Sequence, residues 1–243
     1  MPAVNALLQT GSLPTIVGYI IEAYLGEGGM GVVYRARQRS SGQLVALKML
    51  SRVDAAGIYR IKREFRGLCD IIHPNLVRLL ELHCEGNQWF FTMELVSGRP
   101  FLEHLGVQRS YLVYPSDARS LVPTETPSGD CSVVNDAPFP STLDESSLRD
   151  LLSQLVRGVQ AIHRANKLHC DIKPSNVLVD DTGRVVVLDF GVSVGFGAHE
   201  HLRTIEGEIA GTPEYMSPEQ AVGKELGPAS DWYAFGVVLY QVL

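Results

Sequence analysis

The sequence has few cysteines, no long hydrophobic run and no excess of positive charge, and each shortage excludes a class of protein. Its four cysteines, none in a Cys-x-x-Cys pair, argue against a disulfide framework and against a zinc site. No apolar run approaches the roughly 20 residues that span a bilayer, and the first residues lack a basic head followed by an apolar stretch. A net charge of -6 leaves no basic stripe for nucleic acid or for an anionic membrane. These shortages predict a soluble, cytoplasmic protein.

The chain is long enough and apolar enough to bury a core. Its 243 residues are 45% hydrophobic, which suits one large domain or two small lobes. Residues 1–18 show no periodicity and are expected to be an N-terminal lead-in. Residues 106–140 accumulate Ser, Pro, Thr, Asp and Gly, which predicts a flexible surface insertion.

Strand and helix patterns alternate along the chain. β-branched and aromatic runs between glycine-containing turns predict strands at 19–25, 32–37, 44–49, 76–82 and 88–94. Apolar residues at helical spacing predict a helix over 58–72, on Ile61, Phe65, Leu68 and Ile72. The same spacing predicts a second, longer helix, with a capping box at 142–145 and a core face of Leu148, Leu152, Leu155, Val159 and Ile162.

A predicted β-hairpin in the second half of the chain places polar residues together. Apolar runs at 177–179 and 185–188 flank Asp180–Arg184, whose Gly and Asp suit a hairpin loop. Antiparallel pairing then brings Asn176, just before the first strand, beside Asp189, just after the second. Amide and carboxylate oxygens suit Mg²⁺, which prefers oxygen ligands. The sequence therefore predicts a magnesium site at Asn176 and Asp189.

Two more candidates for phosphoryl transfer precede this hairpin. Asp171 can accept the proton of an attacking hydroxyl, and Lys173 can neutralise charge on a transferred phosphate. The alternative is a loop of solvated polar residues. That alternative would explain a His-x-Asp motif by itself. It does not explain why Asp171, Lys173 and Asn176 follow one another in this order just before the hairpin.

A glycine-rich segment near the N-terminus, Gly26-Glu27-Gly28-Gly29-Met30-Gly31, predicts a place for phosphates. In a dinucleotide-binding fold such glycines open a helix, whereas here Val32-Val33-Tyr34 favours a strand. The segment is therefore predicted to be a hairpin tip whose backbone amides lie over phosphates.

Lys48 and Ala46 alternate onto the same face of the third predicted strand. The small alanine leaves room for a flat base, and the lysine can reach its phosphates. Glu64 borders the buried stripe of the predicted helix and is the candidate to orient Lys48 by an ion pair. The alternatives are a solvated lysine at a strand end and a Glu64 paired with Arg60.

In this order the motifs resemble the eukaryotic-like (Hanks-type) serine/threonine protein kinases, over residues 19–243. The resemblance implies an α+β fold of two lobes, a β-rich N-lobe at 19–96 and a mainly helical C-lobe at 97–243, with ATP between them. It implies ATP and Mg²⁺ as cofactors and transfer of the γ-phosphate to Ser or Thr of a protein or peptide substrate. Autophosphorylation is compatible with this activity.

The resemblance also assigns roles by position. It gives catalysis to Lys48, Glu64, Asp171 and Lys173, and magnesium binding to Asn176 and Asp189. It gives nucleotide binding to the glycine-rich segment and to the residues expected around the adenine: Leu25, Gly26, Glu27, Gly28, Gly29, Met30, Gly31, Val33, Ala46, Lys48, Met93, Glu94, Val96 and Leu178. Met93 looks like the gatekeeper, and the backbone of Glu94 to Val96 looks like the adenine hinge. A stacked spine is implied at Leu68, Leu79, His169 and Phe190, anchored by Asp231, although each apolar member equally suits ordinary core.

Two segments favour Ser/Thr over Tyr as the acceptor. Lys173–Asn176 follows the Ser/Thr pattern of the catalytic loop, and Gly211–Glu219 looks like the peptide-docking segment that small-molecule kinases of related fold usually lack. Gly-Met-Gly in the glycine-rich segment and Ser217–Gln220 resemble bacterial members.

The chain departs from the family pattern in its catalytic loop and at its end. Cys170 stands where the family commonly has an Arg that holds a phosphorylated activation loop. We therefore expect that activity does not depend strongly on phosphorylation at Thr204 or elsewhere between Gly191 and Gly211. The last helical stripe stops at Leu243 without a cap, which predicts an incomplete C-lobe and further domains beyond this residue. A catalytically silent binding or scaffold module is therefore the alternative function.

Overall fold

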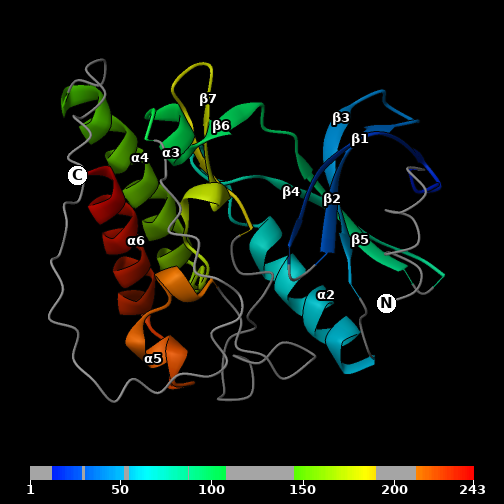
Figure 1. Cartoon of the computed structure of the whole chain (residues 1–243). Helices are drawn as coiled ribbons and strands as arrows, with labels where there is room; N and C mark the ends of the chain where they lie inside the picture. Colours follow the sequence, from blue (N-terminus) through cyan, green and yellow to red (C-terminus); the bar gives the residue numbers. More distant parts are fainter. Residues whose placement is uncertain (1–12, 29–30, 52–54, 87, 108–144, 190–211) are drawn as a thin grey trace, which may run out of the picture.

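The computed structural model describes residues 13–28, 31–51, 55–86, 88–107, 145–189 and 212–243, without the side chains at 55–57, 60 and 64. Two groups of elements lie side by side, a β-sheet with one helix and a set of helices with a small second sheet (Figure 1).

The first group is an antiparallel five-stranded sheet. Its strands are β1 (Tyr19–Gly28), β2 (Gly31–Gln38), β3 (Leu44–Leu50), β4 (Leu79–Glu85) and β5 (Gln88–Glu94), in the order β1-β2-β3-β5-β4. Successive side chains of a strand point to opposite faces. Val32 and Leu47 accordingly join an outer apolar cluster, whereas Val33 and Ala46 pack against the main core.

One helix, α2 (Ala55–Cys69), packs against this sheet. The rings of Phe65 on α2 and Phe91 on β5 have centroids 5.7 Å apart. Lys62 Nζ lies 5.0 Å from the centroid of the Trp89 ring, which is a cation–π distance. Apolar packing and a cationic contact thus hold α2 on β5.

The prediction that this helix reaches Ile72 is wrong. The helix ends at Cys69, the Ile71 N–H bonds the Leu68 carbonyl 3.0 Å away in a tighter turn, and Ile72 is 72% exposed. The cause lies just downstream, because a residue that precedes proline avoids helical backbone angles, and His73 precedes Pro74.

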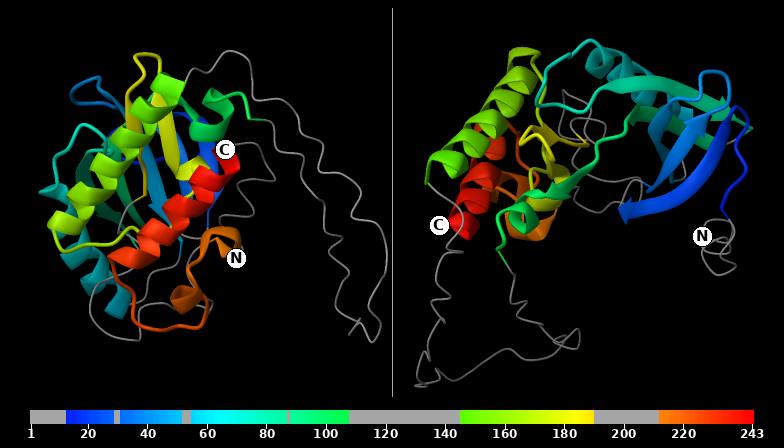
Figure 2. Two further views of the ribbon diagram at one scale, coloured as in Figure 1. Left: turned by 90° about the vertical axis from the view of Figure 1, so that its left-hand side faces the viewer. Right: turned by 90° about the horizontal axis from the view of Figure 1, so that it is seen from above.

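The second group combines helices with a small antiparallel sheet. Its helices are α3 (Phe101–His104), α4 (Glu145–Arg164), α5 (Pro218–Ala221) and α6 (Pro228–Val242), with short turns η1 (Pro174–Asn176) and η2 (Pro213–Tyr215). The sheet has the order β6 (Gly98–Pro100), β7 (Val177–Asp180) and β8 (Val185–Val187). Helices α4 and α6 lie side by side in every view (Figures 1 and 2).

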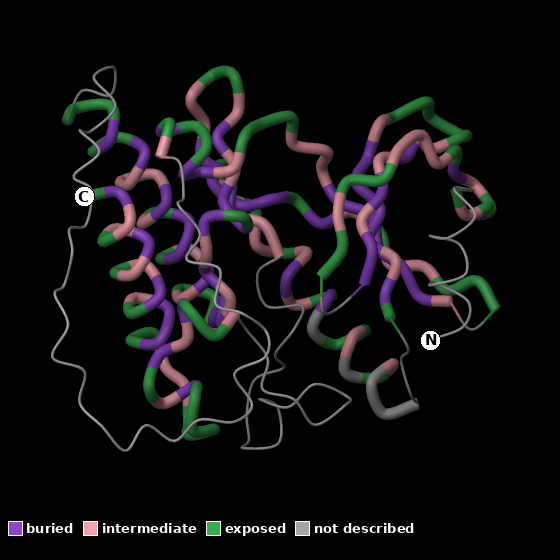
Figure 3. Tube along the Cα trace, viewed as in Figure 1, coloured by how far each residue is buried: buried purple, intermediate pink, exposed green. Residues whose placement is uncertain are grey.

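The segment that leads into β4 joins the two groups. The Val187 N–H bonds the Asn75 carbonyl at 2.9 Å, and the Val77 N–H bonds the Val187 carbonyl at 3.0 Å. This pairing explains why the predicted strand at 76–82 begins only at Leu79, since Leu76 forms a parallel bridge with Val187 instead. Buried positions continue from the sheet into the helical half (Figure 3), and one apolar cluster spans both groups.

The predicted α+β architecture, β-rich first and mainly helical afterwards, is confirmed. The β7–β8 hairpin with its Asp180–Arg184 turn is confirmed as well, and α4 buries the predicted core face except Leu152, which is half-buried. The predicted insertion at 106–140 lies outside the described residues, apart from its first two residues. The predicted capping box at 142–145 lies outside them as well, apart from Glu145, which begins α4. In the part of the chain that the structure describes, no helix is both long and apolar enough to cross a membrane.

Candidate active site

A buried carboxylate fixes the loop between α4 and η1. Asp231 near the start of α6 is 2% exposed and accepts the backbone N–H groups of His169 at 2.9 Å and Cys170 at 2.8 Å. The His163 ring Nε2 lies 2.8 Å from the same carboxylate. Although burial raises the pKa of Asp231, the bond from His163 and the contacts from His169 and Cys170 outweigh it, so the pKa is lowered. Asp231 is therefore ionised near neutral pH and anchors the loop.

His169 connects this loop to the end of β8. Its side chain is fully buried, its Nδ1 accepts the Asp171 N–H at 3.2 Å, and its Nε2 lies 2.9 Å from the Leu188 carbonyl. Because Nδ1 accepts, the proton resides on Nε2, which donates to Leu188. The His169 ring thus links the backbone of Asp171 to that of Leu188, the residue before Asp189.

Cys170 turns the backbone so that Asp171 leaves the interior. Its φ of 62° is in the left-handed region, and Gln220 Nε2 donates to its carbonyl at 2.9 Å. Cys170 is 7% exposed, and burial raises the pKa of the thiol. A buried neutral thiol offers no bidentate cation at this position.

Asp171 is held through both of its carboxylate oxygens. Oδ2 lies 2.8 Å from Lys173 Nζ and accepts Asn176 Nδ2 at 3.0 Å, and Oδ1 accepts the Thr212 hydroxyl at 3.0 Å. Lys173 Nζ also donates to Thr212 Oγ1 at 2.7 Å. The side chains of Asp171 and Lys173 are each 23% exposed, so a ligand can reach both. The sequence reasoning placed Thr212 in a docking segment but missed this contact with the predicted base.

The β7–β8 hairpin brings Asn176 and Asp189 to the same end, as predicted. Val177 pairs with Val187, and the Leu188 N–H bonds the Asn176 carbonyl at 2.8 Å, which places Asp189 one residue further along. Asn176 donates its amide nitrogen to Asp171, so its amide oxygen is the group suited to a cation.

Lys48 contacts Asp189 across the two groups of elements. Its Nζ lies 2.8 Å from Asp189 Oδ1, and its side chain is only 6% exposed. Asp189 has a φ of 53° and a side chain that is 29% exposed. The Glu64 side chain, predicted to pair with Lys48, lies outside the described residues, although its backbone belongs to α2.

Three of the residues predicted around the adenine, Val33, Ala46 and Met93, share one face of the five-stranded sheet with Lys48. Val33 pairs with Lys48 across β2 and β3, and Ala46 pairs with Met93 across β3 and β5. Directly paired residues have side chains on the same face. Leu178 is half-buried on β7, between Pro100 and Val186 in the small sheet. Val96 is half-buried against the main core.

The glycine-rich segment is the predicted hairpin tip. The β1–β2 ladder closes at Gly28 opposite Gly31, while Gly29 and Met30 lie outside the described residues. Gly31 has a φ of 143°, and a Cβ there would lie 1.9 Å from the Met49 carbonyl oxygen, so packing alone requires glycine.

Packing does not explain the two preceding glycines. Among the residues that the structure describes, and apart from its two chain neighbours, a Cβ on Gly26 or Gly28 would meet no atom within 4 Å. Leu25, which precedes the two glycines, and Glu27, which lies between them, are both exposed. Glycine at 26 and 28 therefore suits the close approach of a ligand rather than of another part of the chain.

The segment after Thr212 is ordered by a capped short helix and a hydroxyl–carboxylate contact. The Ser217 hydroxyl accepts the Gln220 N–H at 3.3 Å at the start of α5. The Ser230 hydroxyl donates to Glu219 at 2.5 Å, and this bond lowers the pKa of Glu219. Residues 190–211, with Phe190 and Thr204, lie outside the described residues.

Comparison with known proteins places this fold and site in a family. Residues 19–243 match the protein kinase domain, and the chain belongs to the protein kinase family. It is 33% identical over 235 residues to serine/threonine-protein kinase pkn3 of Myxococcus xanthus, covering 93% of this chain and 37% of the relative. It is 36% identical over 230 residues to the DNA damage-responsive serine/threonine-protein kinase RqkA of Deinococcus radiodurans, covering 92% of this chain and 29% of the relative.

A third relative leads to the same family. Serine/threonine-protein kinase PknA of Mycobacterium tuberculosis is 30% identical over 236 residues, covering 93% of this chain and 46% of the relative. The resemblance to Hanks-type serine/threonine kinases, bacterial ones included, is thereby confirmed. The chain spans less than half the length of each of these relatives.

Proposed function

We propose that this chain transfers the γ-phosphate of ATP, with Mg²⁺, to Ser or Thr hydroxyls of protein substrates. The observation that carries the proposal is the pair of contacts at the open end of the β7–β8 hairpin. There Asn176 holds Asp171 at 3.0 Å, while Asp189 lies 2.8 Å from Lys48. These contacts support a site in which Asp171 is the base, Lys48 and Lys173 are the cations, and Asn176 and Asp189 are the oxygen ligands.

Asp171 is proposed to orient the acceptor hydroxyl and take its proton. Its carboxylate is partly exposed and fixed on both oxygens, which suits a positioned base. Lys173 contacts Asp171 and Thr212, and its charge is placed to offset charge that develops on a transferred phosphate. These two side chains supply positioning and electrostatics, the main contributions in phosphoryl transfer.

The nucleotide is proposed to lie between the sheet and the hairpin. Ala46, Val33 and Leu178 would contact the adenine, Lys48 would contact its α and β phosphates, and Glu64 would orient Lys48. Leu25, Gly26, Glu27, Gly28, Gly29, Met30 and Gly31 would cover the phosphates, and Met93, Glu94 and Val96 would line the hinge side. The space beside Gly26 and Gly28 supports this placement, since no atom of the described residues beyond their chain neighbours lies within 4 Å of a Cβ placed there.

A magnesium ion is proposed at Asn176 and Asp189. Their amide oxygen and carboxylate form a hard donor set that fits Mg²⁺. When bound, the ion would neutralise charge on the nucleotide phosphates. Asp189 holds Lys48 at 2.8 Å in the structure, so the chain keeps this carboxylate and the phosphate-binding cation together.

A Ser/Thr acceptor is supported by Thr212 and by the names of the relatives. Thr212 bridges Asp171 and Lys173, and it begins the ordered segment expected to dock peptides. The three relatives described above are all called serine/threonine-protein kinases. No specific observation favours the silent scaffold, because Lys48, Asp171, Asn176 and Asp189 are all present. A cytoplasmic location and autophosphorylation stay predictions.

The proposal is tested by incubating the protein with γ-labelled ATP, Mg²⁺ and a generic Ser/Thr substrate protein. Wild type should label Ser and Thr, and Asp171→Asn should lower the rate by about 10²- to 10⁴-fold, the range for a lost general base. Label that persists undiminished in Asp171→Asn would overturn the role of Asp171. Absence of transfer by wild type that still binds Mg-ATP would favour the scaffold.

A further inference from the structure

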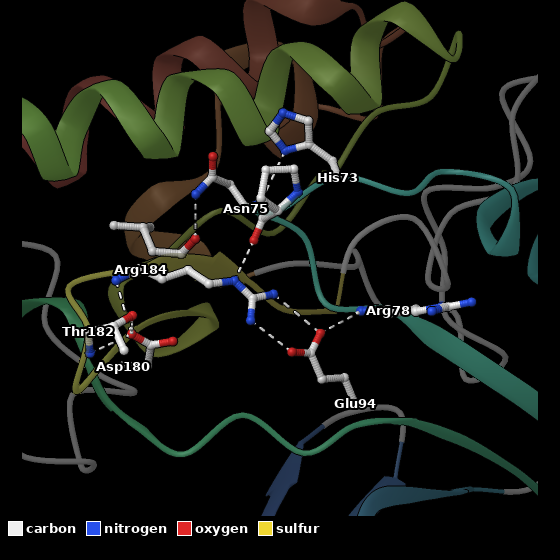
Figure 4. A network of polar contacts seen from close by, with 9 residues as sticks. His73, Asn75, Arg78, Glu94, Asp180, Thr182 and Arg184 are labelled. Atoms are coloured by element: carbon white, nitrogen blue, oxygen red, sulfur yellow. Dashed lines mark hydrogen bonds and ion pairs between the residues drawn. The ribbon is translucent and has the colours of Figure 1, made fainter.

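The end of β5 carries a side-chain contact that the reaction as proposed does not use. Glu94 closes β5, and its backbone is the proposed start of the adenine hinge. Its carboxylate accepts Arg184 Nη1 at 2.8 Å on one oxygen and Nη2 at 3.3 Å on the other (Figure 4). Two parallel bonds from a guanidinium fix the carboxylate in direction as well as in distance.

The same guanidinium is attached to a third segment. Arg184 Nε donates to the Pro74 carbonyl at 2.7 Å, in the connection between α2 and β4. The Glu94 N–H in turn bonds the Arg78 carbonyl at 2.8 Å. All three nitrogen positions of Arg184 are therefore used, and they join the turn of the β7–β8 hairpin to the α2–β4 connection and to the end of β5.

Arg184 is mounted on a rigid turn. Its own N–H bonds Asp180 Oδ1 at 3.0 Å, and Gln154 on α4 bonds both neighbours, accepting from Val185 N at 3.0 Å and donating to the Gly183 carbonyl at 2.9 Å. Asn75 Nδ2 donates to the Val185 carbonyl at 2.8 Å and to Gln154 Oε1 at 3.0 Å. The backbone on both sides of Arg184 is thus fixed to α4 and to the α2–β4 connection, so the guanidinium extends from a fixed base.

The β7–β8 hairpin also carries residues that are proposed to contact the nucleotide and its metal ion. Leu178 lies on β7, and Asn176 and Asp189 flank its open end. The Arg184–Glu94 pair consequently ties the hinge side of the nucleotide site to the part that carries the metal ligands. We propose that Arg184 is a positioning residue that acts through Glu94 to hold the hinge backbone for adenine, and that it governs purine selection and nucleotide affinity rather than the chemical step. The inference rests on the proposed function for its ligand.

An ordinary surface ion pair is the competing explanation. The side chains of Arg184 and Glu94 are 33% and 32% exposed, and exposed pairs contribute little on average. Three features set this pair apart: the bidentate geometry, the third bond to Pro74, and the location of Glu94 at the hinge. The two explanations differ in what removal of the guanidinium changes, because a surface pair affects no ligand.

The test compares wild type with Arg184→Ala, Arg184→Lys, Glu94→Gln and the double variant Arg184→Ala/Glu94→Gln. Steady-state rates are measured with ATP and with GTP, and the Kd of Mg-ADP is measured by calorimetry. In Arg184→Ala we expect KM for ATP and Kd for Mg-ADP to rise by about three- to thirtyfold. This is less than the roughly 10- to 150-fold of a direct charged hydrogen bond, because Arg184 acts through Glu94. We expect kcat to stay within about threefold, and the preference for ATP over GTP to fall, because guanine lacks the hydrogen-bond pattern that a fixed hinge selects.

Lysine and the double variant separate positioning from general destabilisation. Arg184→Lys should recover part of the affinity, because one ammonium can bond Glu94 but cannot reproduce the fork. If Arg184 acts through Glu94, the double variant should lose no more than about the larger single loss, whereas independent effects would multiply. Arg149→Ala is the matched control. It removes an exposed ion pair with Glu145 on α4, 2.6 Å long, and should change neither KM nor the purine preference.

Three outcomes would overturn the inference. The first is a folded Arg184→Ala variant whose KM and purine preference are unchanged. The second is an equal loss of affinity for ATP and GTP that accompanies a lowered Tm. The third is a double variant in which the losses of affinity of the two single variants multiply. The calorimetric measurement keeps this result distinct from the proposed function. A wild-type protein that binds Mg-ADP but transfers no phosphate would refute the kinase proposal, and the effect of Arg184 on binding would still be measured.

Discussion

Two carboxylate regions lie on either side of Cys170 and are built in opposite ways. Asp231 is 2% exposed and accepts two backbone N–H groups and a histidine ring, all fixed by the fold. Asp171 and Asp189 have side chains 23% and 29% exposed, and their contacts come mostly from other side chains. The difference shows how the fold separates tasks, since the buried carboxylate fixes the loop and the two half-buried carboxylates keep contacts that a ligand can replace.

Replacing Asp189 should lower activity strongly and stability only a little. In Asp189→Asn we expect turnover to fall by on the order of a thousandfold, because a charged metal ligand is lost and the ion is worth several kcal/mol of transition-state stabilisation. Turnover is measured against Mg²⁺ concentration, and high Mg²⁺ should recover part of it because asparagine still offers an oxygen. A rate within tenfold of wild type at low Mg²⁺ would remove Asp189 from the metal site.

Replacing Asp231 should show the opposite balance. In Asp231→Ala two backbone N–H groups and the His163 ring lose a buried acceptor, and we expect a loss of about 3 kcal/mol in unfolding free energy. For a chain of this size that corresponds to a Tm lower by roughly 6–12 °C. Thermal unfolding measures it, with the exposed Asp150→Ala on α4 as control. An unchanged Tm would mean that Asp231 does not anchor the loop.

The pH dependence of stability sharpens the same contrast. The pKa of Asp231 is lowered in the folded protein. Its carboxylate therefore contributes stability that is fully present above the unfolded-state pKa of about 3.9 and is lost as the pH falls through the folded-state pKa. The difference in unfolding free energy between wild type and Asp231→Asn should stay constant between about pH 4.5 and 5.5 and shrink below about pH 3.9. A difference that grows as the pH falls would contradict this assignment.

Local signals explain why so much of the site was predictable. The β7–β8 hairpin follows from β-branched runs around a turn that contains Gly, and pairing alone then places Asn176 near Asp189. Alternation along β3 likewise places Ala46 and Lys48 on one face. These predictions needed only the period of a strand and the geometry of a short turn.

Long-range side-chain contacts were not predictable in this way. Arg184 and Glu94 are 90 residues apart, and Thr212 lies 41 residues from Asp171. No periodicity links such partners, because the contact depends on how two separately formed elements pack. The prediction that α2 reaches Ile72 was wrong for a related reason. The spacing of Ile72 fits the apolar stripe of α2, but the helix has already ended at Cys69.

Cys170 lies between the two carboxylate regions and should behave as part of the buried one. Cys170 is 7% exposed, and its burial raises the pKa of the thiol. Little reactive thiolate therefore forms. In native protein treated with iodoacetamide, exposed Cys84 should be alkylated at least about tenfold faster than Cys170, as read by peptide mass spectrometry. Denatured protein should lose this difference. Rapid native modification of Cys170 would show that the loop opens.

The smallest expected effect concerns Thr204, which lies outside the described residues. In the family pattern an Arg next to the catalytic Asp can hold a phosphorylated activation loop, whereas Cys170 offers a buried, uncharged thiol. A phosphate at Thr204 would therefore find no guanidinium at this position, and Thr204→Ala should keep kcat within about threefold of wild type, a change of under 1 kcal/mol in the barrier. Phosphatase-treated wild type is the matched control and should behave alike. A collapse of kcat in both samples would show that another cation takes the phosphate, and that the region around Asp171 depends on a charge supplied from outside the loop.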